Sequence, residues 1–431
     1  MARSLAEETS APAAAKVGRV RWIVVLLLFA ATVINYVDRQ MIGLLKDPLS
    51  KEFNWHETTY ADIVFYFQLA YAIGYIFFGN IVDRIGSRLG YAVAFLIWTA
   101  AHMLHAAASS VASFAAVRFM LGIGESGSFP SALKSVTEWF PKKERAFATG
   151  LFNAGSNLGA IITPFIVAFL APLVGWRGTF VVTGVFGILW LIAWLAVYRR
   201  PEQAKRLSKA ELAYIEQDAP DAAAPVPWTR LLTRRETWAF AIGKFLTDPV
   251  WWMFLFWLPD FLHKRHGLDL TTFGPPIAVI YIVSDLGSIG GGWLSSHLIH
   301  RGWTINAARK STMLICALAV TPIFFARYVD GLWAAVAIIS LAAAAHQAWS
   351  ANLYTIASDM FPRKAVGSVY GIGGTAGAVG GMLFSLFIGE VLEKSGNYTL
   401  IFLVSGCVYL IALLIIHLLS PRLAEAKVAD A

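Results

Sequence analysis

Twelve apolar segments run through this chain, each close to the roughly 20 residues that a helix needs to cross a bilayer. The runs are continuous rather than alternating over about ten residues, which excludes a transmembrane β-barrel. Only helices then remain to satisfy their own backbone hydrogen bonds in lipid. We therefore predict an all-α polytopic membrane protein with spans at residues 21–45, 58–82, 89–110, 112–137, 146–170, 178–198, 237–262, 273–300, 308–327, 331–357, 366–393 and 398–420.

Composition agrees with this class. Of the 431 residues, 57% are hydrophobic and 14% are charged, whereas a soluble domain carries roughly a quarter charged residues. These values exclude an ordinary soluble enzyme, a disordered scaffold and a nucleic-acid-binding domain. The net charge of +8 does not indicate a nucleic-acid partner, because the basic residues are not gathered on one element. Cys316 and Cys407 both lie in apolar segments, so we expect no disulfide framework, metal or cofactor.

Lysine and arginine are distributed unevenly between the two sides of the predicted helices. With the N-terminus inside, 24 of the 35 fall on the cytoplasmic side, 7 outside and 4 within helices. Cytoplasmic loops are enriched in these residues, so we expect both termini in the cytoplasm. The N-terminal residues lack the apolar core of a signal peptide. The expected organisation is a tail at 1–20, a six-helix bundle at 21–198, a cytoplasmic loop at 199–236, a second six-helix bundle at 237–420 and a tail at 421–431.

The two predicted bundles repeat a sequence pattern. Phe140-Pro141-Lys142-Lys143 followed by Gly150 recurs as Phe361-Pro362-Arg363-Lys364 followed by Gly371. The long polar stretch 199–236 divides the spans six and six. A duplicated six-helix unit is typical of transporters built from two pseudosymmetric halves, with the binding site between them near the middle of the membrane.

Four charged residues lie in the first and fourth spans away from the cytoplasmic ends that carry Arg21 and Lys134: Asp38, Arg39, Arg118 and Glu125. Each such charge costs roughly 2.5–3.5 kcal/mol on insertion scales, which makes it a candidate for function. A rise of about 1.5 Å per residue puts Asp38 and Arg118 at similar depth. We therefore predict an Asp38–Arg118 pair and a looser Arg39–Glu125 pair. They form either a static clamp or a proton-coupled anion site, in which an arginine holds a carboxylate and a nearby acid titrates.

The fifth, seventh and tenth predicted spans, which we call helices 5, 7 and 10, carry further polar and aromatic candidates for the binding site. Lys244 and Asp248 are four residues apart and share one face, as a structural pair or as part of the site. Trp251 and Trp252 lie too centrally for an interfacial belt, so we expect at least one of them to line the cavity and stack on a sugar ring. Substrate hydrogen bonds are expected from the amides of Asn157, Gln347 and Asn352, whereas His102, His105 and His346 are interpreted as core residues.

Several of these motifs resemble a known family. Asn35-Tyr36-Val37-Asp38-Arg39, the stretch Gly79-Asn80-Ile81-Val82-Asp83-Arg84-Ile85-Gly86-Ser87-Arg88, and Arg118 to Glu125 with Trp139-Phe140-Pro141 resemble the major facilitator superfamily. Within it they resemble the anion:cation symporters. The segments 244–252 and 345–352 are similar to those of bacterial hexuronate transporters. The resemblance covers nearly the whole chain.

The resemblance implies the major facilitator fold and proton symport of a sugar-acid anion, D-glucuronate or D-galacturonate, by alternating access. Arg39 would bind the substrate carboxylate, and Tyr36 and Tyr71 its hydroxyls. Asp38 and Glu125 would be the protonation sites, with Arg118 as the partner of Asp38. A cytoplasmic latch in the outward-open state is implied for Asp83, Arg84 and Arg88. The second-half copy has Ser296 and His297 where an acid and a base are expected, so any latch there is weaker or absent.

The sequence also bears on four other functions. The same mechanism with an aldonate, an aldarate or an aromatic carboxylate fits the aromatic density of helix 7. A drug:proton exporter is disfavoured because helix 5 lacks the glycine-proline signature of such antiporters. An intramembrane enzyme would need a catalytic constellation, which the sequence lacks, and a channel is disfavoured by the duplication and the buried charges. The expected partners are a small organic anion, a coupling proton and the lipid of a bacterial cytoplasmic membrane. We expect a monomer because one complete unit of six plus six helices has its own site.

Overall fold

A computed structural model describes residues 18–217, 227–361, 363–424 and 426, without the side chains of Ile76, Gly79, Asn80, Asp83, Lys142, Lys143, Ala146, Arg363 and Lys364. The described residues form helices, and no strand occurs among them. The first group of helices comprises α1 (Val20–Leu44), α2 (Lys46–Phe53), α3 (Glu57–Leu104), η1 (His105–Ala107), α4 (Val111–Ser126), α5 (Ser128–Trp139) and α6 (Lys142–Val197).

A connecting segment with three short helices precedes the second group. In it, the carboxylate of Glu211 accepts hydrogen bonds from the backbone N–H groups of Val20 and Arg21, both at 3.2 Å, so the segment packs against the start of α1. The remaining elements are η2 (Pro201–Gln203), α7 (Lys209–Ile215), α8 (Trp228–Leu232), α9 (Arg235–Phe256), α10 (Leu258–His266), α11 (Gly274–His300), α12 (Ile305–Val320), η3 (Thr321–Arg327), α13 (Leu332–Met360), α14 (Arg363–Ser395) and α15 (Thr399–Leu419).

Two continuous helices each contain two spans. α3 turns at Gly86 (φ 81°) and α6 at Gly175 (φ 69°), in a backbone region that glycine alone enters without a steric penalty. The helix pairs α4–α5, α9–α10 and α12–η3 each form one span, so the described residues make twelve bilayer-length segments. Eight helices in this part of the chain are long and apolar enough by length and composition alone, one of them covering both arms of α6. The predicted twelve-span fold is confirmed.

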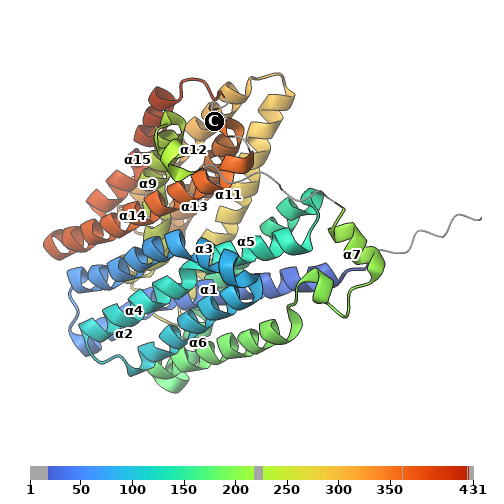
Figure 1. Ribbon diagram of the computed structural model, residues 1–431. Coiled ribbons are helices and arrows are strands. Elements are labelled where there is room, and N and C mark those ends of the chain that lie inside the picture. The colour runs from blue at the N-terminus through green and yellow to red at the C-terminus, as the bar shows by residue number, and fades with distance from the viewer. Residues whose placement is uncertain (1–17, 218–226, 362, 425, 427–431) are drawn as a thin grey trace, which may run out of the picture.

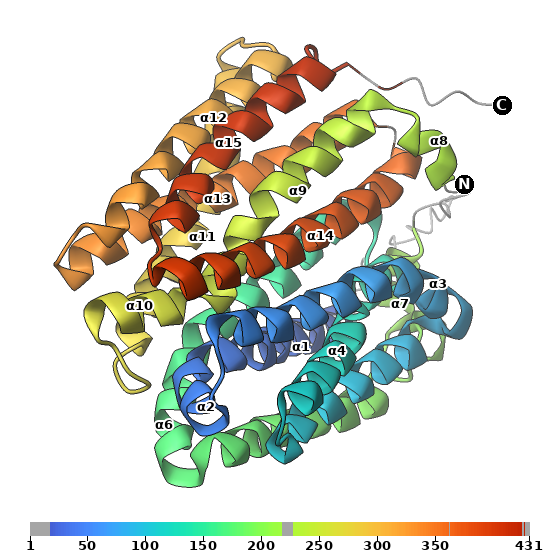
Figure 2. The ribbon, with the colours of Figure 1, turned by 90° about the vertical axis from the view of Figure 1, so that its left-hand side faces the viewer.

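The spans form two halves, the first from α1 to α6 and the second from α9 to α15 (Figures 1 and 2). Within the halves, α1 packs on α6, α3 on α4, α9 on α14 and α11 on α13. The halves meet where α3 contacts α14 and α6 contacts α11. In Figure 1 the α5 and α11 ribbons spread apart toward the end of the molecule that carries α7. The exact residue limits assigned to the two bundles from sequence stay predictions.

Candidate substrate cavity

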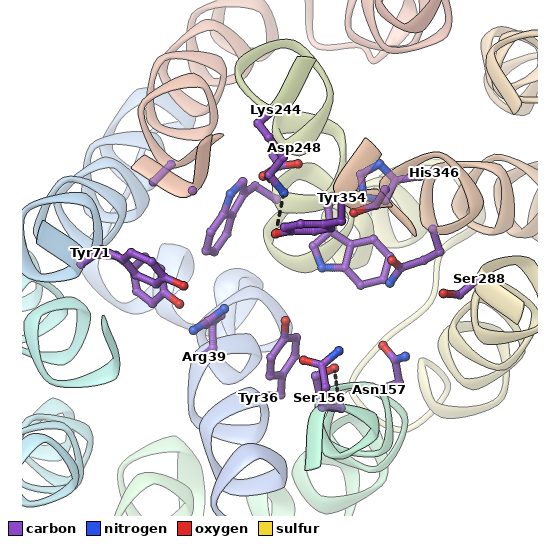
Figure 3. Close-up of a pocket in the computed structure, with 18 residues that line it drawn as sticks. Tyr36, Arg39, Tyr71, Ser156, Asn157, Lys244, Asp248, Ser288, His346 and Tyr354 are labelled. Atoms are coloured by element: carbon purple, nitrogen blue, oxygen red, sulfur yellow. Dashed lines mark hydrogen bonds and ion pairs between the residues drawn. The ribbon is translucent and has the colours of Figure 1, made fainter. Parts of the chain in front are cut away.

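A cavity of about 270 Å³ lies between the two halves. Its volume is near the lower end of the roughly 300–1,000 Å³ that is usual for small-molecule sites. Most of the lining side chains carry a polar atom, and they come from both halves (Figure 3). The lining residues are Tyr36, Arg39, Tyr71, Tyr75, Asn153, Ser156, Asn157, Lys244, Asp248, Trp251, Trp252, Ser288, His346, Gln347, Ser350, Tyr354, Gly374 and Ala378.

Arg39 is the cation on the first-half wall. Its Nε donates to Glu125 Oε2 at 2.8 Å, and its second terminal nitrogen donates to Asn35 Oδ1 at 3.0 Å. Glu125 is fully buried, so this ion pair lies away from bulk water. Arg39 and Glu125 are thus in direct contact, whereas the sequence suggested only a loose pair between them. Because each charge neutralises the other, the wall carries no net charge until a ligand or a proton changes the pairing.

Aromatic rings surround the Arg39 guanidinium. Its Cζ lies 4.9 Å from the ring centroid of Tyr36, 5.0 Å from that of Tyr71 and 5.3 Å from that of Trp252. Such contacts are worth roughly 0.5–2 kcal/mol each, depending on exposure. The rings hold the planar group in place and exclude water around it, which strengthens any charged hydrogen bond made there.

Lys244 is the matching cation on the second-half wall. Its Nζ lies 2.7 Å from Asp248 Oδ2 and donates to the Tyr354 hydroxyl at 3.0 Å. Figure 3 shows this pair across the cavity from Arg39 and Tyr71. Each half therefore presents one cation paired with one carboxylate, and an anion that enters between them meets two positive groups.

Both tryptophans of α9 line the cavity. Trp251 stacks on His346, with ring centroids 5.3 Å apart and planes 9° from parallel. The His346 ring is held in turn by a 2.6 Å hydrogen bond between its Nδ1 and the Tyr409 hydroxyl. Trp252 stacks on Phe256, with centroids 5.8 Å apart. The two indoles are therefore fixed in orientation before any ligand arrives.

Of the predicted ligands, Asn352 alone is absent from the cavity wall. Its side chain is 1% exposed, and its amide nitrogen donates to the carbonyls of Gly291 at 3.1 Å and Ala348 at 2.9 Å. Asn352 is five residues after Gln347, about 140° further around α13, so it points to α11 instead of the cavity. We correct the expectation accordingly: in this structure Asn352 joins α13 to α11.

The predicted Asp38–Arg118 pair is also absent from the described part of the chain. Asp38 Oδ1 lies 3.3 Å from His102 Nε2, which in turn lies 2.8 Å from Thr183 Oγ1. The Arg118 guanidinium lies over the Phe67 ring at 4.6 Å, and among the described residues it donates one hydrogen bond, to the Arg39 carbonyl at 3.5 Å. Neighbouring residues on a helix point about 100° apart. Asp38 therefore faces α3 while Arg39 faces the cavity. The sequence had suggested only a structural role for His102, and the contact between His102 and Asp38 was not predicted.

Comparison with known proteins now decides the family. Residues 28–385 match the family model of the Major Facilitator Superfamily. The chain belongs to the Major Facilitator Superfamily. It is 30% identical to the hexuronate transporter of Escherichia coli K12, covering 88% of this chain and 90% of that protein. It is also 30% identical to the D-galactonate transporter of E. coli O6:H1, and that match covers 89% of this chain and 92% of the other protein.

A solved structure supports the same fold. The crystal structure of a bacterial homologue of the human lysosomal transporter Spinster, in an inward-facing and occupied conformation, matches with a TM-score of 0.72. The match covers 94% of this chain and 98% of the other at 21% identity. The chain is thus a transporter of the major facilitator type and not an enzyme, and its similar relatives are named as sugar-acid transporters.

The two halves of this major facilitator protein are tied together at the end that carries α2 and α10, which we call the closed end. Lys46 Nζ lies 2.6 Å from both Glu57 Oε2 and Asp260 Oδ1. Lys264 contacts the same two acids, with 3.1 Å to Asp260 Oδ2. In the described part, the hydrogen bonds and ion pairs that join the two helical halves all lie between this end and the cavity, including Gln68–Ser385 and Asn157–Asp285.

The implied latch residues lie at the opposite end. The side chain of Asp83 is outside the described residues, and Arg84 is exposed. Arg88 donates to the Leu195 carbonyl at 2.6 Å, within the first half. Since the latch is expected in the outward-open state, the role of these three residues stays a prediction.

Sequence reasoning missed several residues that the fold brings to the site. The sequence did not single out Tyr75, Ser288 and Tyr354, which line the cavity together with the polar neighbours of the predicted ligands, Asn153, Ser156 and Ser350. Lys46 and Lys264 were counted as loop charges, yet they form the closed end. Asp285 of α11 could have been recognised from the sequence as a candidate functional residue, because it is an acid inside the predicted span 273–300.

Proposed function

We propose that this protein imports a sugar-acid anion, D-glucuronate or D-galacturonate, across a bacterial cytoplasmic membrane by proton symport with alternating access. The observation that carries the proposal is the position of Arg39, which reaches the central cavity among Tyr36, Tyr71 and Trp252 and is paired with the buried Glu125. The names of two relatives, a hexuronate and a D-galactonate transporter, support the substrate class.

The coupling step follows from competition for Arg39. A guanidinium binds a carboxylate through two parallel hydrogen bonds, and a substrate carboxylate would compete with Glu125 for these donors. A buried carboxylate that loses its cation partner becomes costly as an anion and takes up a proton. Substrate and proton would then bind together and leave together. We assign Asp38 as the second protonation site, with His102 rather than Arg118 as the group that touches it.

The rest of the cavity suits a polyhydroxylated ligand. Tyr36, Tyr71, Asn157 and Gln347 supply hydroxyl and amide groups, and Trp251 and Trp252 supply faces for the C–H side of a sugar ring. One observation favours a second candidate. Lys244 offers another cation across from Arg39, which an aldarate with a carboxylate at each end would use better than a hexuronate does. An aldonate is a further candidate because of the D-galactonate relative.

The asymmetry of lysine and arginine supports an orientation. With both termini cytoplasmic, the closed end of the molecule faces outward and the end near α7 faces the cytoplasm. The ion pairs of Lys46 and Lys264 would then seal the outer side, as expected for an inward-facing state of the cycle. In the outward-facing state these contacts have to separate.

The test is uptake of radiolabelled glucuronate into liposomes under an inward proton gradient, with unlabelled galactonate and galactarate as competitors. Asp38→Asn and Glu125→Gln are measured beside Glu52→Gln, a control that removes an exposed carboxylate outside the cavity. We expect the first two to abolish gradient-driven accumulation, with exchange retained in at least one, and the control to transport normally. Uptake that survives both Asp38→Asn and Glu125→Gln, or that ignores the gradient in the unaltered protein, overturns the coupling mechanism.

A further inference from the structure

Asp285 is a carboxylate in the middle of a membrane span that the mechanism above does not use. It lies eleven residues after the start of α11 at Gly274, about 16 Å along the helix axis. It shares a helical face with the buried Tyr281, four residues earlier, and with Ser288, three residues later, which lines the cavity. Ile282 and Leu286, by contrast, are exposed on the lipid-facing side. The carboxylate therefore points into the seam between the halves.

The partner of Asp285 is a neutral side chain of the other half. Asn157 Nδ2 on α6 donates a hydrogen bond to Asp285 Oδ1, and Asn157 itself lines the cavity. In the described part of the chain, no lysine, arginine or histidine forms an ion pair with Asp285. α11 packs against α6, α12 and α13.

The titratable groups on these helices are engaged elsewhere. On α13, His346 bonds to Tyr409, Tyr354 bonds to Lys244, and Asp359 pairs with Arg309 of α12. Lys310 donates to the Ser420 carbonyl, and Cys316 is buried on α12. On α6, Arg21 and Tyr214 contact Glu144, and Arg177 pairs with Glu52 near the helix turn. Among the described residues, an ionised Asp285 is therefore balanced by the amide dipole of Asn157 and by no cation.

We propose that Asp285 is a proton-binding site at the α6–α11 seam, and that its proton exchange is coupled to the movement of the two halves. An unpaired carboxylate at this depth costs roughly 2.5–3.5 kcal/mol, a cost that protonation removes. The neutral acid still accepts from Asn157, so the seam can stay packed when the proton is bound. Opening the seam hydrates the group and favours the ionised form. Proton uptake and release at Asp285 are thereby linked to closing and opening of this contact. The inference rests on the proposed proton coupling and adds a third titrating acid to it.

The first experiment needs no substrate, which separates this inference from the proposed function. Infrared difference spectra of the purified full-length protein are recorded between alkaline and acidic buffer. We expect a protonated-carboxyl band that Asp285→Asn removes and that Asp38→Asn and Glu125→Gln leave in place. Asn157→Ala keeps the acid and is expected to shift this band without removing it. A spectrum of Asp285→Asn identical to that of the unaltered protein overturns the proposal, even if transport proves to be proton-driven.

The second experiment measures coupling in liposomes. Asp285→Asn is nearly isosteric and is expected to retain substrate exchange while carrying one proton fewer per substrate. Under an inward gradient of about one pH unit, the limiting accumulation ratio should then fall about tenfold, which corresponds to about 1.4 kcal/mol. Asp330→Asn is the matched control, because it makes the same change at an exposed carboxylate paired with Arg265 outside the cavity and leaves the proton count unchanged. An unaltered accumulation ratio in Asp285→Asn overturns the coupling.

Discussion

Lys46 Nζ lies 2.6 Å from Asp260 Oδ1, and this ion pair joins the first half of the molecule to the second. The lysine side chain is 6% exposed and that of the aspartate 7%. Glu57 adds a second carboxylate to the lysine at 2.6 Å, and the Tyr398 hydroxyl donates to Asp260 at 2.5 Å. Lys46, Glu57 and Asp260 thus each have several partners, as a buried ion pair requires to offset its desolvation.

Removing Lys46 should open this end. Lys46→Met leaves Glu57 and Asp260 with Lys264 as their cation in the described part of the chain, and breaking a buried pair costs about 3–5 kcal/mol. We expect a Ser385→Cys reporter, buried beside Gln68 on the cavity side of the closed end, to be labelled faster by an impermeant maleimide added outside. The control is Lys51→Met, which breaks an exposed pair with Asp47 worth about 0–1 kcal/mol. Equal labelling in the two variants would count against the assignment.

The closed end should resist moderate changes of pH. Burial lowers the pKa of Lys264, but the attraction of Asp260 and Glu57 outweighs burial and raises the pKa above its usual value. A raised pKa in the folded state means that the contribution of Lys264 is complete below its unfolded pKa of about 10.4 and is lost as pH rises through the folded value. Labelling of Ser385→Cys should therefore stay constant near neutrality and increase only in strongly alkaline buffer. A rise between mildly acidic and neutral pH would contradict this.

Arg39→Lys should weaken substrate binding while the protein still folds. An ammonium cannot form the two parallel hydrogen bonds of a guanidinium or stack as a plane between Tyr36 and Tyr71. We expect the KM for glucuronate exchange to rise about tenfold or more, equivalent to about 1.4 kcal/mol. Arg177→Lys, at a partly exposed pair with Glu52, is the matched control and should leave KM unchanged. A normal KM in Arg39→Lys would remove Arg39 from the carboxylate site.

His102→Leu should change the pH profile of proton-driven uptake. The substitution removes the group that touches Asp38 at 3.3 Å and leaves the substrate cavity intact. His105→Leu is the control, since His105 bonds to the Ala101 carbonyl of its own helix and stacks on Phe180. We expect a shifted profile only for His102→Leu, with exchange retained in both variants. The same shift in both would mean that general packing of α3 is responsible.

Gly175→Ala should destabilise the protein through the backbone alone. Gly175 has φ of 69° and ψ of 172°, and a Cβ there would meet no atom within 4 Å, so the cost is that of placing alanine in a backbone region that is essentially restricted to glycine, about 1–3 kcal/mol. Gly150 also has open space around it but lies within regular helix, so Gly150→Ala should be neutral or slightly stabilising. Thermal unfolding in detergent should give a lower Tm for Gly175→Ala alone, and equal Tm values would argue against the turn.

The sequence by itself determined the twelve spans and the duplicated architecture. In lipid a helix must satisfy its own backbone hydrogen bonds, so a long apolar run leaves few alternatives. It also determined which helices carry the site, because charges such as Arg39 and Glu125 are too costly in a membrane to be incidental. Seven of the eight predicted substrate ligands line the cavity, namely Tyr36, Arg39, Tyr71, Asn157, Trp251, Trp252 and Gln347.

Only the tertiary structure decided which side chains meet. Depth along a helix can be counted from the sequence, but the rotation of each helix and the identity of its neighbours depend on packing between distant segments. Asp38 therefore contacts His102 instead of Arg118, and Asn352 faces α11 instead of the cavity. Lys46 with Asp260 and Asn157 with Asp285 connect the two halves, so they exist only when the halves are assembled.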